Sequence, residues 1–216
     1  MANPLLYFMS CVNLLSLLIA VGIGLWRWAL LSASLRFAWA GLLSYFLLFG
    51  VQVVAALTET KLNYTLTNYA ITACFGAAFA LCFALAVPPG RSRRLILGLG
   101  ALGFTGLVAE AAGLTEGLPV TRLATPFQTI INTLLPLIYL RYLTRTARSS
   151  LLLVPLFWIS VGRLVSSLSS TLYDVLETPL AESSRELLIQ WQYLRFAITS
   201  GCNLVYAFGF WKTKRR

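Results

Sequence analysis

The chain has 216 residues, of which 58% are hydrophobic and 11% are charged, and its net charge is +10. It contains no histidine, which excludes bis-histidine haem ligation, histidine metal sites and histidine general-base catalysis. This composition predicts an integral membrane protein whose parts outside the bilayer are too short to fold as a separate domain.

Seven apolar segments follow one another along the chain, and each can cross a hydrocarbon core of about 30 Å at about 1.5 Å per residue. They are residues 4–26, 37–57, 68–87, 95–114, 124–143, 151–173 and 190–211. We therefore expect an all-α integral membrane protein with seven transmembrane helices in a single domain, residues 1–216. Because Met1-Ala2-Asn3-Pro4, before the first segment, has no basic residue and no small-residue cleavage site stands out, we expect a retained helix and not a signal peptide.

The charged side chains separate onto the two sides of this predicted bundle. One side carries twelve of the seventeen cations and no acid: Arg27, Arg36, Arg91, Arg93, Arg94, Arg141, Arg145, Arg148, Lys212, Lys214, Arg215 and Arg216. The other side carries all seven carboxylates: Glu59, Glu110, Glu116, Asp174, Glu177, Glu182 and Glu186. Basic loops remain in the cytoplasm, so we expect the N-terminus outside and the C-terminus inside, in a plasma (inner) membrane. The expected partners of the basic loops are anionic lipid headgroups and not nucleic acid.

The remaining reactive residues fit no catalytic or cofactor site. The only lysines, Lys61, Lys212 and Lys214, lie at membrane edges, which excludes a retinal Schiff base within the bundle. Asp174 is the only aspartate, and an aspartyl protease needs two. The four cysteines are scattered and form no C-x-x-C pair. We expect no enzyme activity, no cofactor and no metal.

Polar side chains inside the predicted spans form a layer about 18–24 Å from the cytoplasmic helix ends, by the helical rise. The layer contains Gln52, Thr72, Glu110, Gln128, Arg163 and Arg195. Helical spacing also places a polar stripe on each of the last two segments. These stripes are Arg163, Ser166, Ser167, Ser170 and Asp174 on the sixth, and Gln192, Arg195 and Thr199, with Asn203 one turn deeper, on the seventh.

A charge at the centre of a membrane helix costs about 2.5–3.5 kcal/mol, so these charges must be paired or solvated. One interpretation is that Glu110 bridges Arg163 or Arg195 and locks three helices together. A second is that the layer lines an outward-opening pocket for a small polar, anionic or polyhydroxyl solute. The candidate binding residues are then Gln52, Glu110, Gln128, Arg163, Ser167, Ser170, Arg195 and Asn203. A third interpretation is an interface with another membrane subunit.

The first three and the last three segments resemble each other. Residues 69–74 and 196–202 share an aromatic residue, Ala-Ile-Thr, a small residue and then cysteine, and Trp39 and Trp158 open the second and sixth segments. Short apolar sequences also match by chance, so both explanations stay open. A true duplication would give two parallel repeats, 4–87 and 124–211, joined by a linker helix at 95–114.

This 3+1+3 plan with an outer N-terminus resembles the seven-helix SWEET and PQ-loop membrane proteins. Leu135-Pro136-Leu137, followed by the basic stretch from Arg141 to Arg148, is similar to the proline-bearing helix of that family and its cytoplasmic exit; the glutamine that follows the family's proline is absent. The resemblance implies a small-solute carrier that opens alternately to each side. A receptor that signals to a separate cytoplasmic protein, and an assembly subunit of a larger membrane complex, share the same topology and remain alternatives.

Overall fold

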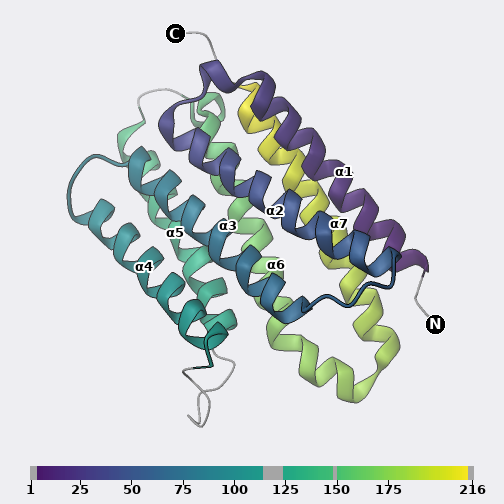
Figure 1. The fold of residues 1–216 in the computed structure, drawn as a ribbon. Coiled ribbons are helices and arrows are strands. Elements are labelled where there is room, and N and C mark those ends of the chain that lie inside the picture. The colour runs from purple at the N-terminus through teal and green to yellow at the C-terminus, as the bar shows by residue number, and fades with distance from the viewer. Residues whose placement is uncertain (1–3, 114–123, 148–149, 214–216) are drawn as a thin grey trace.

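The computed structural model describes residues 4–113, 124–147 and 150–213 (Figure 1). Within these residues the chain is all-helical, as predicted. The helices are α1 (Pro4–Trp26), α2 (Ala33–Leu57), α3 (Tyr64–Ala86), α4 (Arg91–Ala111), α5 (Ala124–Thr146), α6 (Pro155–Ser183) and α7 (Arg185–Trp211), with short 3₁₀ turns at Trp28–Leu30 and Leu151–Leu153. Each predicted segment overlaps one of these helices.

The largest difference from prediction is at the connection between α6 and α7. Residues 174–189 lie between the sixth and seventh predicted segments, but α6 continues to Ser183 and α7 begins at Arg185. Ser184 caps α7, because its side chain accepts a hydrogen bond from the backbone N–H of Leu187. Hydropathy locates the part of a helix that is apolar, whereas helix propensity and caps decide where the helix ends.

Four helices, α1 to α4, are long and apolar enough to cross a membrane, with mean hydropathies of 2.2, 2.0, 2.0 and 1.4. The chain is therefore a membrane-embedded protein. Helices α5, α6 and α7 are of similar length or longer but carry more polar residues. Many of the polar residues on α6 and α7 face the interior of the bundle, as described below.

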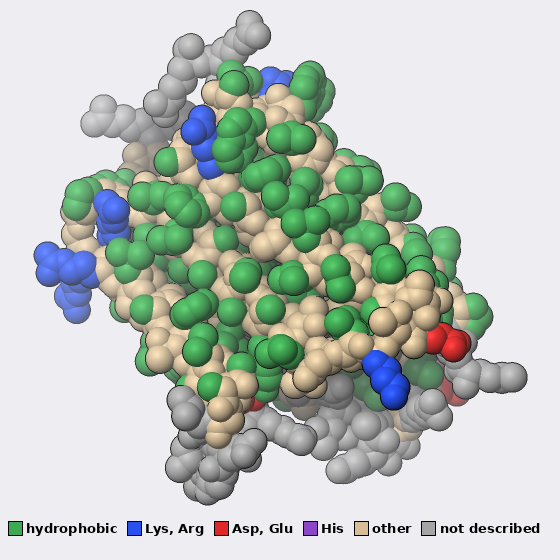
Figure 2. All heavy atoms as spheres, viewed as in Figure 1, with side chains coloured by type: hydrophobic (Ala, Val, Ile, Leu, Met, Phe, Trp, Pro, Cys, Tyr) green, Lys and Arg blue, Asp and Glu red, His purple; other side chains and the backbone are tan. Residues whose placement is uncertain are grey.

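Six helices form a closed ring, in which α1 packs against α2, α2 against α3, α3 against α5, α5 against α6, α6 against α7 and α7 against α1. Helix α4 packs against α3 and α5 and lies at the outer edge of the bundle (Figure 1). Successive helices run in opposite directions, so the bundle has two ends. We call the end where α1 begins the acidic end and the end where α1 terminates the basic end. Figure 2 shows the hydrophobic side chains that cover the face between them.

The half of the bundle toward the basic end has a buried aromatic core. Phe79, Phe83, Tyr139 and Tyr206, from α3, α5 and α7, are all buried. The centroid of the Phe79 ring lies 6.0 Å from that of Phe83 and 5.9 Å from that of Tyr206, and Phe83 stacks on Tyr139 at 5.5 Å. These four side chains, which we call the aromatic cluster, fill the centre of the ring at this level.

The packing of α3, α4 and α5 depends on two glycines that make room for a glutamine. Gln128 on α5 is 2% exposed. A Cβ atom added at Gly103 on α4 would overlap the side-chain oxygen of Gln128, and one at Gly76 on α3 would lie 2.5 Å from its Nε2 atom. The glutamine amide therefore occupies a slot between two helix backbones.

We expect Gly103→Ala to lower the free energy of unfolding by about 1–3 kcal/mol, because the added methyl group would collide with the enclosed Gln128 side chain. Gly106→Ala is the matched control, one turn along the same helix, where an added Cβ atom meets no other atom. It should be neutral or slightly stabilising, because alanine has the higher helix propensity. Thermal unfolding in detergent measures both variants, and equal effects would contradict the assignment of the slot.

Candidate functional site

The ring encloses a cavity of about 600 Å³, a volume typical of small-molecule sites. All six helices of the ring contribute to its wall. The lining residues are Leu6, Asn13, Tyr45, Phe49, Gln52, Asn68, Ile71, Thr72, Phe75, Thr129, Asn132, Arg163, Ser166, Ser167, Ser170, Tyr173, Gln192, Arg195, Phe196 and Thr199. Leu6 lies near the start of α1 and Gln52 near the end of α2, so the cavity extends toward the acidic end.

Five of the eight predicted binding residues line this cavity: Gln52, Arg163, Ser167, Ser170 and Arg195. Their helices bring together residues from three parts of the chain, because α2, α6 and α7 all belong to the ring. Glu110, Gln128 and Asn203 are not among the residues that line it. Each of these three differs from prediction for its own reason.

Glu110 is on α4, which packs outside the ring against α3 and α5. Its Oε1 atom accepts a hydrogen bond of 2.6 Å from the hydroxyl of Tyr69 on α3. In the described part of the chain, no ion pair joins Glu110 to Arg163 or Arg195, so the predicted bridge is not formed. Equal depth in the membrane did not bring these side chains together, because α4 does not pack against α6 or α7.

Gln128 occupies the slot between Gly76 and Gly103 and faces α4 rather than the cavity. Asn203 lies on α7 at the interface with α1 and is 1% exposed. Its Nδ2 atom donates to Asn13 Oδ1 and to Ser16 Oγ, both at 2.9 Å. Asn203 therefore supports the cavity wall, since Asn13 lines the cavity, but it does not line it itself.

We expect Asn203→Ala to lower the free energy of unfolding by about 1–2 kcal/mol, because Asn13 and Ser16 would each lose a hydrogen-bond donor in a buried site. Gln52→Ala serves as control, since the bond of 2.8 Å from Gln52 Nε2 to Asn68 Oδ1 is exposed. It should change stability by less than about 0.5 kcal/mol. Thermal unfolding of both variants in detergent is the measurement, and a neutral Asn203→Ala would show that the network adds no stability.

Arg163 on α6 is the most deeply placed charge in the cavity wall, with 4% of its surface exposed. Its guanidinium carbon lies 4.2 Å from the ring centroid of Phe75 and 5.0 Å from that of Phe79. Among the residues described, it has no carboxylate partner, and its Nε atom has no hydrogen-bond partner. Two aromatic faces therefore hold the charge in position but do not neutralise it.

Arg195 on α7 occupies a different position. Its guanidinium carbon lies 4.4 Å from the ring centroid of Tyr173, whose hydroxyl accepts a hydrogen bond of 2.9 Å from Gln192 Nε2. Tyr173 is ten residues from Arg163 on α6, roughly 15 Å of helical rise toward the acidic end. No ion pair between Arg195 and another described residue is formed.

The two arginines thus lie at two depths and not in the single layer that the sequence predicted. Arg163 is eight residues, about 12 Å, from the basic-end start of α6, whereas Arg195 is sixteen residues, about 24 Å, from the basic-end terminus of α7. The sixth helix begins at Pro155 rather than at residue 151, because a 3₁₀ turn precedes it and proline favours the first helical position. The wall consequently has an inner cation and an outer cation.

Several hydroxyl groups in the wall donate their hydrogen bonds to backbone carbonyls of their own helices. Thr72 Oγ1 donates to the carbonyl of Asn68, and Thr199 Oγ1 donates to that of Arg195, both at 2.8 Å. Ser167 Oγ donates to the carbonyl of Arg163, also at 2.8 Å. Toward a bound solute these oxygens can only accept hydrogen bonds. The guanidinium groups are therefore the strongest donors that the described wall presents.

No protein-family model, curated protein or solved structure matches the chain. Function is therefore inferred from the chemistry of the cavity.

The sequence predictions did not include Asn13, Tyr45, Phe75 and Asn132 among the binding residues, although all four line the cavity. Asn13 and Asn132 are amides within predicted membrane spans, which is a signal for an interior position. Tyr45 and Phe75 give no such signal, because aromatic residues are common throughout these spans. Only the packing of α2 and α3 shows that their rings face the cavity.

Proposed function

We propose that the protein is a membrane carrier that binds a small polar or anionic solute in the cavity between its helices. The supporting observation is that Arg163 and Arg195 both face this space without a carboxylate partner among the described residues. Buried charge that has no partner is costly in a membrane, and water or an anionic solute would compensate it.

The helix contacts support a carrier with two three-helix units. Helices α1 to α3 and α5 to α7 meet at two seams, α1 with α7 and α3 with α5, while α4 remains outside as a connecting helix. Rocking of the units about these seams would expose the cavity alternately to each side, as parallel-repeat carriers do. In this structure the cavity extends toward the acidic end, which is the predicted outer side.

The aromatic cluster favours a second candidate, a receptor that binds the same solute without moving it. Phe79, Phe83, Tyr139 and Tyr206 fill the ring between the cavity and the basic end. A carrier must separate these side chains in every cycle, whereas a receptor needs only to transmit a change in their packing to a cytoplasmic partner at the basic end.

Counterflow in proteoliposomes separates these candidates. Vesicles containing the full chain would be loaded with unlabelled acetate, benzoate, succinate or phosphate and diluted into the same labelled anion, with protein-free vesicles as control. Protein-dependent uptake of label supports the carrier. Binding measured by calorimetry without uptake supports the receptor, and neither binding nor uptake of any probe would overturn both and favour an assembly subunit.

The proposed orientation, with seven spans and the acidic end outside, predicts the labelling of introduced thiols. The four native cysteines are first replaced by serine. Lys61→Cys should then react with a membrane-impermeant maleimide added to intact cells, because residue 61 connects α2 and α3 at the acidic end. Arg94→Cys at the basic end should react only after the cells are permeabilised. The reverse pattern would overturn the orientation.

A further inference from the structure

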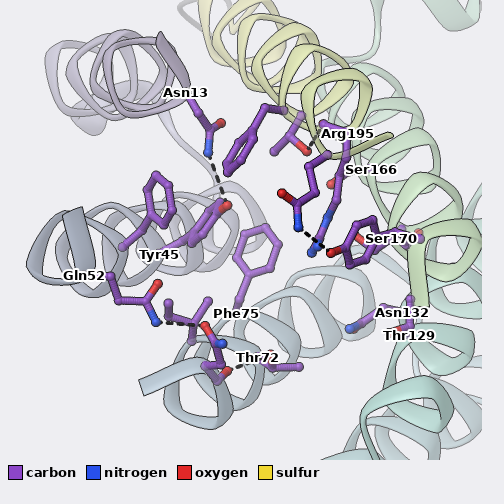
Figure 3. Close-up of a pocket in the computed structure, with 18 of the residues that line it drawn as sticks. Asn13, Tyr45, Gln52, Thr72, Phe75, Thr129, Asn132, Ser166, Ser170 and Arg195 are labelled. Carbon is purple, nitrogen blue, oxygen red and sulfur yellow. Dashed lines mark hydrogen bonds between the residues drawn. The ribbon is translucent and has the colours of Figure 1, made fainter. Parts of the chain in front are cut away.

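The two sides of the cavity wall differ in chemistry (Figure 3). One side carries a row of aromatic rings from α7, α2 and α3. The centroid of Phe196 lies 6.5 Å from that of Phe49, Phe49 lies 5.6 Å from Tyr45, and Tyr45 lies 5.4 Å from Phe75. Figure 3 shows Ser166, Ser170, Thr129 and Asn132 on the opposite side. A solute that fills this space meets a continuous row of aromatic rings on one side, whereas the other side carries the single ring of Tyr173 among polar groups.

The buried charge of Arg163 lies at the inner end of this aromatic row, 4.2 Å above Phe75. The hydroxyl of Tyr206 faces this guanidinium, and the Nε atom of Arg163 is buried without a hydrogen-bond partner. Arg163 also lines the cavity, so its guanidinium is the charged group available to a bound anion at this end. Two parallel N–H groups of one guanidinium match the two oxygens of a carboxylate.

The outer cation does not offer an equivalent second position. Arg195 stacks on Tyr173 near the mouth, roughly 15 Å of helical rise from the level of Arg163. Ile71, Tyr45 and Phe49 contribute apolar surface to the wall. The hydroxyls of Ser167, Thr72 and Thr199 donate to their own helices, so they cannot donate to an anion.

We infer that the solute is an aromatic monocarboxylate, with its carboxylate on Arg163 and its ring along the row of Phe75, Tyr45 and Phe49. This inference rests on the proposed function, because it assumes that the solute binds in this cavity. The guanidinium selects the negative charge, and the aromatic row selects the ring through offset or edge-to-face contacts. A cavity of about 600 Å³ has room for such a molecule together with water.

Calorimetry on the full chain in detergent, with four probes, tests the inference. Benzoate carries both the ring and the charge, benzamide the ring alone, acetate the charge alone, and succinate two charges without a ring. Benzoate should bind with a Kd at least about 10-fold lower than each of the other three, since it alone makes both the charge-assisted bonds and the ring contacts.

Two arginine variants locate the carboxylate. Arg163→Gln should weaken benzoate binding at least about 10-fold and leave benzamide binding unchanged, because only the charged contact is lost. Arg36→Gln is the matched control, because Arg36 also stacks on an aromatic ring, that of Trp28, but does not line the cavity; it should change the Kd of benzoate less than about threefold. Arg163→Lys, which keeps the charge without the paired donors, serves if the glutamine variant does not fold and should also weaken benzoate binding.

Failure of the inference differs from failure of the proposed function. If acetate or succinate binds as tightly as benzoate and depends on Arg163, the cavity still binds an anion but the aromatic class is wrong. If benzamide equals benzoate, the assignment of the charge to Arg163 is wrong. If none of the five probes, these four and phosphate, binds to the wild-type chain, both the inference and the proposed function are overturned.

Discussion

Arg163→Met should stabilise the unliganded protein and at the same time remove its response to an anionic solute. A charge at the centre of a membrane helix costs about 2.5–3.5 kcal/mol, and the two flanking aromatic faces return about 2 kcal/mol. Because Arg163 is 4% exposed and has no carboxylate partner among the described residues, the difference remains as a net cost. Methionine removes that cost and fills similar space.

We expect the free energy of unfolding of the unliganded variant to rise by about 1 kcal/mol. The affinity for a carboxylate should fall about 100-fold, as expected for the loss of about 3 kcal/mol of charge-assisted hydrogen bonding. Thermal unfolding with and without 10 mM benzoate or phosphate, about a typical screening concentration for weak ligands, measures both effects. Arg36→Met is the control, because the exposed side chain of Arg36 stacks on Trp28 and does not line the cavity. A destabilised Arg163→Met that anions still stabilise would show that the guanidinium has a structural role.

The opposite signs of the two effects are the informative part of this experiment. Replacing a residue that serves only the fold lowers the stability of the protein. A residue kept for binding often destabilises the unliganded protein, so replacing it raises the stability. Arg163 lies on α6, contacts two rings of α3 and lines the cavity. The fold therefore keeps a charge without a carboxylate partner among the described residues at this position.

Phe79→Ala should be among the most destabilising single substitutions in the chain. Phe79 is 0% exposed and packs against Phe75, Phe83 and Tyr206, and the guanidinium of Arg163 lies 5.0 Å from its ring centroid. In a bilayer the lipid is as apolar as the protein interior, so moving the Phe79 side chain between them changes the free energy little. The expected loss of stability comes mainly from lost packing contacts. A void of about 100 Å³ at about 24 cal/mol per Å³ corresponds to about 2–3 kcal/mol.

Phe8→Ala is the control for this prediction, because Phe8 on α1 is 61% exposed and leaves no enclosed void when truncated. It should change the free energy of unfolding by less than about 0.5 kcal/mol. Thermal unfolding in detergent and in nanodiscs measures both variants. Equal losses would show that the aromatic cluster is loosely packed, which would remove the main support for the receptor as second candidate.

The sequence by itself determined the class of the protein and the location of its polar residues along each helix. Hydropathy placed every helix within a few residues at most ends, because a span must be apolar over about 20 residues whatever its neighbours are. The spacing of Arg163, Ser167 and Ser170 predicted one polar face of α6, and all three residues line the cavity. The seven-span orientation, the repeat and the resemblance to SWEET proteins stay predictions.

Only the tertiary structure decided which polar residues share a site. Depth along a helix is readable from sequence, but the order of helices around a bundle is not, because it depends on side-chain packing between segments far apart in the chain. Helix α4 lies outside the ring, so Glu110 binds Tyr69 instead of an arginine. Gln128 fills the space beside two glycines on α3 and α4 and does not line the cavity. Asn203 donates a hydrogen bond to Asn13 on α1. The aromatic row beside Arg163 likewise forms only when α2, α3 and α7 close the ring, since its rings come from three separate helices.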